Sequence, residues 1–137
     1  MSGMNNIPSW VGTPQWHQVR ERTANYTAAD WSAFRAELSA IHREILAAMR
    51  AGTPVDDPVV MDLVEEHRSH VSRWQYDCDH DAHRQLADIY LTTNRLARSY
   101  EDMAPGLTLY IHQAMVANYE RWVSRGCVPD PAPGPGC

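Results

Sequence analysis

The feature that most constrains this sequence is the spacing of its apolar side chains, which recur every three or four residues through most of the chain. This is the period of an α-helix that buries one face. Thr27 and Asp30 are placed to form an N-terminal capping box, and Gly52 stands where that helix is expected to end. The apolar stripe between them is Trp31, Phe34, Leu38, Ile41, Ile45 and Ala48. No segment alternates with period two for long enough to be a strand, so the pattern predicts an all-α fold.

Further helices are expected wherever the same period follows a helix-start signal. These signals are Pro14, the Asp57-Pro58 pair, the Tyr76-Asp77 pair and Pro105. A further short helix is expected over about residues 94–103. Cys78 is expected to open the stripe of the helix that follows Asp77. The connections between the helices are short, so the sequence predicts a single domain of five to seven helices.

The chain divides into three segments by composition. Residues 1–26 are interrupted by proline and glycine but carry Trp10 and Trp16, so we expect a flexible N-terminal segment, with one short helix, that covers another surface. Residues 27–125 hold the periodic stripes and form the predicted helical domain. Residues 126–137 are rich in proline and glycine and are expected to be a loose tail, because such a segment cannot propagate a helix.

Charge and length exclude several classes of protein. The formal net charge is −5 over 137 residues, and all twelve basic residues are arginine, which argues against a basic surface for nucleic acid. No apolar run approaches the roughly 20 residues that span a bilayer. The first residues lack a signal peptide, and the three cysteines are an odd number. We therefore expect a cytoplasmic protein with free thiols that associates with neither membrane nor nucleic acid.

Polar residues that interrupt the apolar stripes are the candidates for function. His67 and Asn118 stand where an apolar residue would serve the core, and His83 lies near Tyr90 on the flank of its helix. Gln85 follows Cys78 by seven residues and so borders the same stripe. Each of these residues is explained most simply as a hydrogen-bonded core residue. Their occurrence together with many aromatic side chains favours a pocket for a bulky, flat, weakly polar ligand.

Metal, haem and hydrolytic chemistry are weaker alternatives. The pairs His67/His70 and His80/His83 each place two imidazoles one helical turn apart, but no Cys-x-x-Cys or His-Glu-x-x-His pattern supports a zinc site. The acidic residues at positions 77, 79 and 81 resemble a solvated first turn, and no Gly-x-Ser-x-Gly or phosphate loop is present. The sequence therefore predicts no enzyme activity and no cofactor.

Two stretches resemble a known family. Residues 66–78 read Glu-His-Arg-Ser-His-Val-Ser-Arg-Trp-Gln-Tyr-Asp-Cys, and residues 83–90 read His-Arg-Gln-Leu-Ala-Asp-Ile-Tyr. This block is similar to the signature of the TipA-type antibiotic-recognition domain, which in its family follows a MerR-type DNA-binding region. The resemblance continues in the segments that begin at Trp10, Thr27, Ala51 and Ala104, and it covers about residues 10–123.

The resemblance implies a globin-like helical fold that binds bulky antibiotics, such as thiopeptides or albicidin, in a cleft closed by the leading segment. Members that capture thiopeptides carry a cysteine two residues after the motif histidine, and it adds to a dehydroalanine of the ligand. Gln85 occupies that position here, and an amide cannot perform this addition. Cys78 resembles a packing residue of the family. The chain shows no helix-turn-helix, which suggests a stand-alone module that acts by sequestration, with a sensor or adaptor role as the alternative.

We therefore expect a monomer or weak dimer that binds an aromatic natural product noncovalently and confers resistance by sequestering it. Trp10 and Trp16 are the expected lid. The expected contacts with the ligand are His67, Trp74, Tyr76, His83, Gln85, Tyr90, Tyr110 and Asn118.

Overall fold

Every regular element in residues 11–126, the part of the chain that the computed structural model describes, is a helix. The elements are α1 (Pro14–Thr23), α2 (Ala28–Arg50), α3 (Pro58–Trp74), α4 (His80–Thr92), α5 (Asn94–Met103) and α6 (Leu107–Ser124). The prediction of an all-α domain of five to seven helices is confirmed. None of these helices is both long enough and apolar enough to cross a membrane.

Local capping explains where the two longest early helices begin. The Thr27 hydroxyl accepts a hydrogen bond from Asp30 N, and the Asp30 carboxylate accepts one from Thr27 N, which completes the predicted capping box of α2. Asp57 caps α3 and accepts from Val59 N at 2.9 Å. Gly52 follows α2 with φ of +74°, a left-handed conformation that glycine adopts without strain.

Two predicted helix starts are wrong by two residues each. α4 begins at His80 rather than directly after Asp77, because Asp79 is the residue that caps it and accepts from Ala82 N at 2.8 Å. Cys78 therefore lies in the loop before α4 instead of on its stripe. α6 begins at Leu107, since Gly106 takes a left-handed φ of +88° and precludes a helix that starts at Pro105.

The helices enclose one main core and one smaller cluster. The main core collects buried side chains from five helices: Ile41, Ile45, Val60, Val64, Ala87, Tyr90, Tyr100, Leu107, Ile111, Ala114 and Met115. The smaller cluster is Val71, Tyr76 and Cys78, against which Val19 of α1, Ala82 and Leu86 pack. Burial of these faces stabilises the fold by about 25 cal/mol per Å² of apolar surface removed from water.

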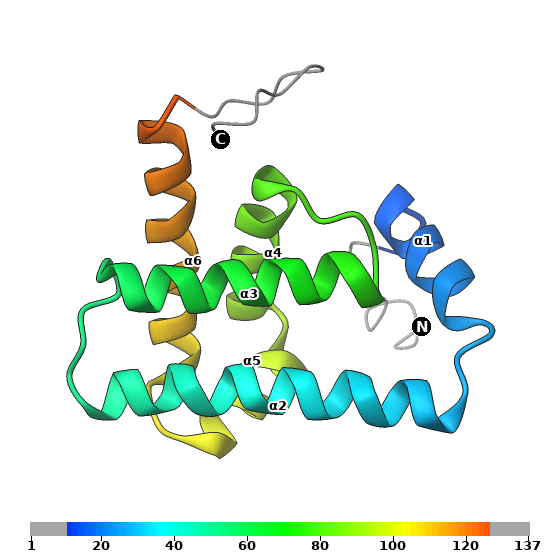
Figure 1. The fold of residues 1–137 in the computed structure, drawn as a ribbon, viewed down its shortest axis with the longest axis horizontal. Helices are drawn as coiled ribbons and strands as arrows, with labels where there is room; N and C mark the ends of the chain where they lie inside the picture. The colour runs from blue at the N-terminus through cyan, green and yellow to red at the C-terminus, as the bar shows by residue number, and fades with distance from the viewer. Residues whose placement is uncertain (1–10, 127–137) are drawn as a thin grey trace, which may run out of the picture.

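The arrangement leaves α1 at one end of the molecule. α2 and α3 run side by side in opposite directions, and α6 crosses behind them (Figure 1). α1 lies near the end of α3 and the beginning of α2, and none of its residues is fully buried. α1 is therefore a peripheral element that rests on the edge of the helical body.

Candidate functional site

A cavity of about 450 Å³ opens between α1, α2, α4 and α5. This volume lies within the roughly 300–1,000 Å³ of typical small-molecule sites. Residues from five separate stretches of the chain line it, from the turn before α1 to the last residue of α5. The site therefore exists only in the folded chain.

The walls of the cavity are mainly apolar and aromatic. α4 presents Ala82, Leu86 and Ile89, which share one face because they follow the helical period. α2 adds Leu38 and α5 adds Leu96 and Met103, while the aromatic walls are Tyr76, Tyr90 and Tyr100. Such a surface suits a ligand with flat apolar parts.

The polar groups at the cavity carry no charge. Three amide side chains line it, Gln15 of α1, Gln75 at the end of α3 and Gln85 of α4. No Asp, Glu, Lys or Arg is among the described residues that line the cavity. Because an amide both donates and accepts hydrogen bonds, these groups match the amides and heteroatoms of an uncharged molecule.

His42 and Tyr100 form a polar pair in the cavity wall. His42 Nε2 lies 3.2 Å from the Tyr100 hydroxyl, and the two rings meet edge to face with centroids 5.1 Å apart. Burial, with a smaller contribution from the positive charge of His70, lowers the pKa of His42 to about 4. Burial raises the pKa of Tyr100 to about 12. At neutral pH both side chains are therefore uncharged.

A second polar layer lies behind this wall. The Tyr90 hydroxyl is 3.2 Å from His67 Nε2, and His67 Nδ1 is 2.9 Å from His83 Nε2. Burial first, and nearby positive charge second, hold the pKa of His67 well below its usual value and lower that of His83 to about 3. Two neutral imidazoles share one proton in such a bond, so the pair is a satisfied hydrogen-bonded unit inside the core.

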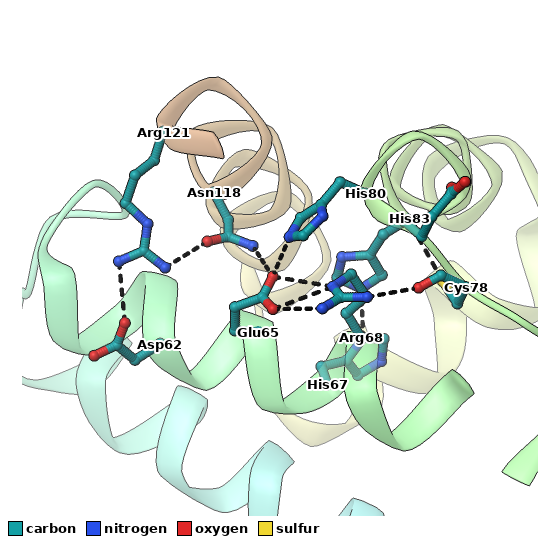
Figure 2. Close-up of polar contacts among 10 residues, drawn as sticks. Asp62, Glu65, His67, Arg68, Cys78, His80, His83, Asn118 and Arg121 are labelled. Atoms are coloured by element: carbon teal, nitrogen blue, oxygen red, sulfur yellow. Dashed lines mark hydrogen bonds and ion pairs between the residues drawn. The ribbon is translucent and has the colours of Figure 1, made fainter. Parts of the chain in front are cut away.

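Glu65 joins three helices behind the histidines. Its carboxylate accepts hydrogen bonds from Arg68, from His80 of α4 at 2.8 Å and from Asn118 of α6 at 2.9 Å (Figure 2). Partial burial alone would raise the pKa of Glu65, but these hydrogen bonds outweigh it and hold the pKa well below its usual value. Arg68 also donates to the Cys78 carbonyl at 2.8 Å. The network therefore fixes α3, α4 and α6 relative to one another.

α1 is attached to the helical body by a few polar contacts and one apolar contact. Arg22 donates to the Ser72 carbonyl at 2.6 Å and pairs with the Asp77 carboxylate. Gln18 accepts from Asp77 N at 2.7 Å, and Val19 packs on the smaller core cluster. Since Gln15 and Val19 also line the cavity, α1 forms one wall of it.

The structure brings some of the predicted site residues to the cavity. Tyr76, Gln85 and Tyr90 line it, and His67 and His83 lie one layer behind Tyr90. Asn118 lies in the Glu65 network instead, where it also accepts from Arg121 at 2.7 Å.

The remaining predicted residues lie elsewhere. Trp74 packs edge to face on Tyr26 and donates from Nε1 to Glu37 at 2.9 Å, so it belongs to the joint between α2 and α3. Tyr110 donates to the Thr53 carbonyl at 2.8 Å and lines a different hollow. Trp16 stacks with Arg20 along α1, and Trp10 lies outside the described residues.

Sequence reasoning missed His42, Tyr100 and the residues of α5. A signal for His42 was present, because it follows Leu38 by four residues and is therefore on the same side of α2. The contact itself joins residues 58 positions apart. Among the described residues, no group of three or more His, Cys, Asp and Glu side chains is arranged to hold a metal ion.

Comparison with known proteins now decides the family. The sequence model of the TipAS antibiotic-recognition domain matches residues 7–118. The chain belongs to the TipAS family. This TipAS domain is similar to a solved structure, that of TipAS from Streptomyces lividans in complex with the thiopeptide nosiheptide. The two superpose with a TM-score of 0.78 at 36% sequence identity, and the match covers 82% of this chain and 78% of that one.

Two transcriptional activators are similar to the same part of this TipAS domain. The activator TipA of Streptomyces coelicolor is 36% identical over 112 residues, which are 82% of this chain and 44% of TipA. The activator mta of Bacillus subtilis is 32% identical over 99 residues, 72% of this chain and 38% of mta. The chain thus spans less than half the length of these relatives. They are named as regulators and not as enzymes.

Proposed function

We propose that the cavity binds a bulky, uncharged, aromatic natural-product antibiotic without forming a covalent bond. The observation that carries this proposal is a cavity of about 450 Å³ with apolar and tyrosine walls, amide side chains and no charged lining residue, in a chain of the TipAS family. The similar TipAS structure that holds nosiheptide supports a thiopeptide as the ligand class.

Binding follows from burial of apolar ligand surface, with hydrogen bonds that set the orientation. Flat rings lie against Tyr76, Tyr90 and Leu86, and each Å² of apolar surface removed from water contributes about 25 cal/mol. The amide of Gln85 meets a polar group of the ligand at the edge of the cavity. A thiopeptide is larger than the cavity, so its remaining part extends past Gln85 and α1.

α1 is the lid in this proposal. It has no fully buried residue, and it is held by two hydrogen bonds, the packing of Val19 and the Arg22–Asp77 pair, which is exposed on the Asp77 side. Exposed ion pairs contribute little to stability, so α1 separates from the body at low free-energy cost and closes on the ligand. We extend this role to the whole of residues 1–26.

The test is a calorimetric titration with nosiheptide of three proteins: the unchanged chain, Gln85→Trp and Leu91→Trp. Gln85 is exposed and lines the cavity, so the indole fills the entrance without entering the core. Leu91 lies on the same helix, is 42% exposed and does not line the cavity. We expect Gln85→Trp to weaken binding about tenfold or more while Leu91→Trp binds like the unchanged chain. Equal affinity of all three would overturn the location of the site.

The biological role that we propose for this binding is sequestration of the drug. We propose further that the protein acts in the cytoplasm as a monomer or weak dimer. A nosiheptide-sensitive bacterium that expresses the chain should tolerate more drug, in proportion to the amount of protein, and the Gln85→Trp variant should give no protection. Similarity to the activators TipA and mta favours a second role, in which the chain senses the drug for a partner. Binding that is intact in calorimetry but gives no protection in cells would favour this sensor.

A further inference from the structure

The pair His42–Tyr100 is a polar feature of the cavity wall to which the proposed function assigns no role. The two residues come from α2 and α5, both line the cavity, and Nε2 and the hydroxyl are 3.2 Å apart. Tyr100 is only 7% exposed and His42 is half-buried. A polar pair that faces an apolar cavity needs a partner there when a ligand displaces the water.

We propose that His42 is a specificity-determining residue that donates a hydrogen bond from Nδ1–H to an uncharged acceptor of the ligand, such as an azole nitrogen or a carbonyl oxygen. This inference rests on the proposed function and names the chemical group that the site selects.

The direction of the hydrogen bond follows from the chemistry of the pair. A phenol hydroxyl is a stronger donor than an imidazole N–H, and an imidazole nitrogen is a stronger acceptor than a phenol oxygen. The Tyr100 hydroxyl therefore donates to Nε2, and the ring proton of neutral His42 stays on Nδ1. Within residues 11–126 no side chain or carbonyl forms a hydrogen bond with Nδ1, so this donor is available to a ligand.

The surroundings make this donor selective. Burial lowers the pKa of His42 to about 4, so the ring offers a neutral N–H rather than a charge at pH 7. The other polar residues of the wall are amides and hydroxyls, and no carboxylate of the described lining competes for the proton. An acceptor without charge fits this wall, whereas an anion or cation loses its hydration and finds no countercharge.

Two small probes of nearly the same shape isolate this hydrogen bond. The thiazole ring of 2-phenylthiazole offers an azole nitrogen, and 2-phenylthiophene has a C–H in its place. Affinities are measured by NMR titration for the unchanged protein, His42→Phe and the matched control His17→Phe, which alters an exposed histidine of α1 that does not line the cavity. The ratio of the two affinities within each protein is then compared between proteins, which cancels the difference in hydrophobicity between the probes.

We expect His42→Phe to shift the affinity ratio about three- to tenfold against 2-phenylthiazole, which is the effect of one net hydrogen bond. His17→Phe should leave the ratio unchanged, and His42→Gln, which keeps a donor, should restore part of the preference. If His42→Phe is too unstable, Tyr100→Phe is the second variant. It keeps the imidazole but removes the hydroxyl that holds the proton on Nδ1, so the preference should again fall.

Equal ratios in the unchanged protein and in His42→Phe overturn the role of His42 but leave the proposed function intact, because both probes still bind. If Gln85→Trp fails to exclude the probes, the cavity is not their site and the inference also falls. Long-range ¹H–¹⁵N spectra of the free protein give an independent check. A neutral ring protonated at Nδ1 is expected for His42, and protonation at Nε2 contradicts the inference.

Discussion

Replacement of Tyr90 by phenylalanine tests whether the second polar layer holds the cavity wall in place. Tyr90 is 8% exposed and its hydroxyl is 3.2 Å from His67 Nε2, while His67 is 3% exposed. Tyr90→Phe removes one oxygen and keeps the ring that packs in the core. The other nitrogen of His67 is already bonded to His83 at 2.9 Å, so Nε2 is left without a partner.

The expected loss of stability follows from that unpartnered nitrogen. A buried polar atom that loses its hydrogen-bond partner costs about 1–3 kcal/mol. The cost arises at His67, because Tyr90→Phe removes the only hydroxyl that is hydrogen-bonded to its Nε2 in the described part of the chain. In urea, with a slope of about 1–3 kcal/mol per M for a small domain, the midpoint of unfolding should fall by roughly 1 M.

Tyr119→Phe is the matched control. The Tyr119 hydroxyl donates to the Asp81 carboxylate at 2.9 Å at the rim of α4 and α6, where water replaces it. Both variants are unfolded in urea and followed by circular dichroism at pH 7. A midpoint for Tyr90→Phe that is no lower than that of Tyr119→Phe would refute the reasoning, since His67 would not depend on the Tyr90 hydroxyl.

Three further outcomes follow from the network and the cavity. Glu65→Gln should lower the free energy of unfolding at pH 7. The difference from the unchanged chain should shrink as pH falls below about 4, because the carboxylate with its lowered pKa stabilises the fold only while it is ionised. Urea midpoints at several pH values measure this difference. The unchanged protein should lose stability as pH falls from about 6.5 toward 3, since His83 has a folded pKa of about 3 and unfolded histidine binds protons first; a flat profile of urea midpoints contradicts it. Gln85→Cys should gain the mass of a dehydroalanine-bearing thiopeptide, because the thiol adds across the double bond and nothing leaves; an intact-mass spectrum without that increment contradicts the placement of residue 85 at the ligand.

The helices were predictable from sequence where a signal is local. The capping box of Thr27 and Asp30 lies within one helical turn, so the beginning of α2 follows from neighbouring residues. The beginning of α4 was not predictable in this way, because Asp77 and Asp79 can both cap a helix. Asp79 is the residue that caps α4, and the loop before it is held by a longer-range contact, from Arg68 to the Cys78 carbonyl.

The cavity was predictable in kind but only partly in its residues. Polar residues on apolar stripes, together with many aromatic residues, predicted a pocket, and Gln85 and Tyr90 of the predicted set line it. The seven-residue spacing from Cys78 that placed Gln85 does not apply, because Cys78 lies in the loop before α4. Trp74 is also an aromatic residue on a helical stripe. It packs on Tyr26 and donates a hydrogen bond to Glu37, and neither residue neighbours it in sequence. Which aromatic residue faces a ligand and which one joins two helices depends on contacts between distant segments, and one sequence does not contain that information.

The most direct test of the account is a methyl NMR spectrum of the protein with and without saturating nosiheptide. If the drug occupies the cavity between α1, α2, α4 and α5, the methyl signals of Leu86, Ile89 and Leu96 should shift. Those of Val59 and Leu109, which are 63% and 52% exposed and do not line the cavity, should stay in place. Shifts confined to Val55 and Val116, which line the separate hollow beside Tyr110, would contradict the account.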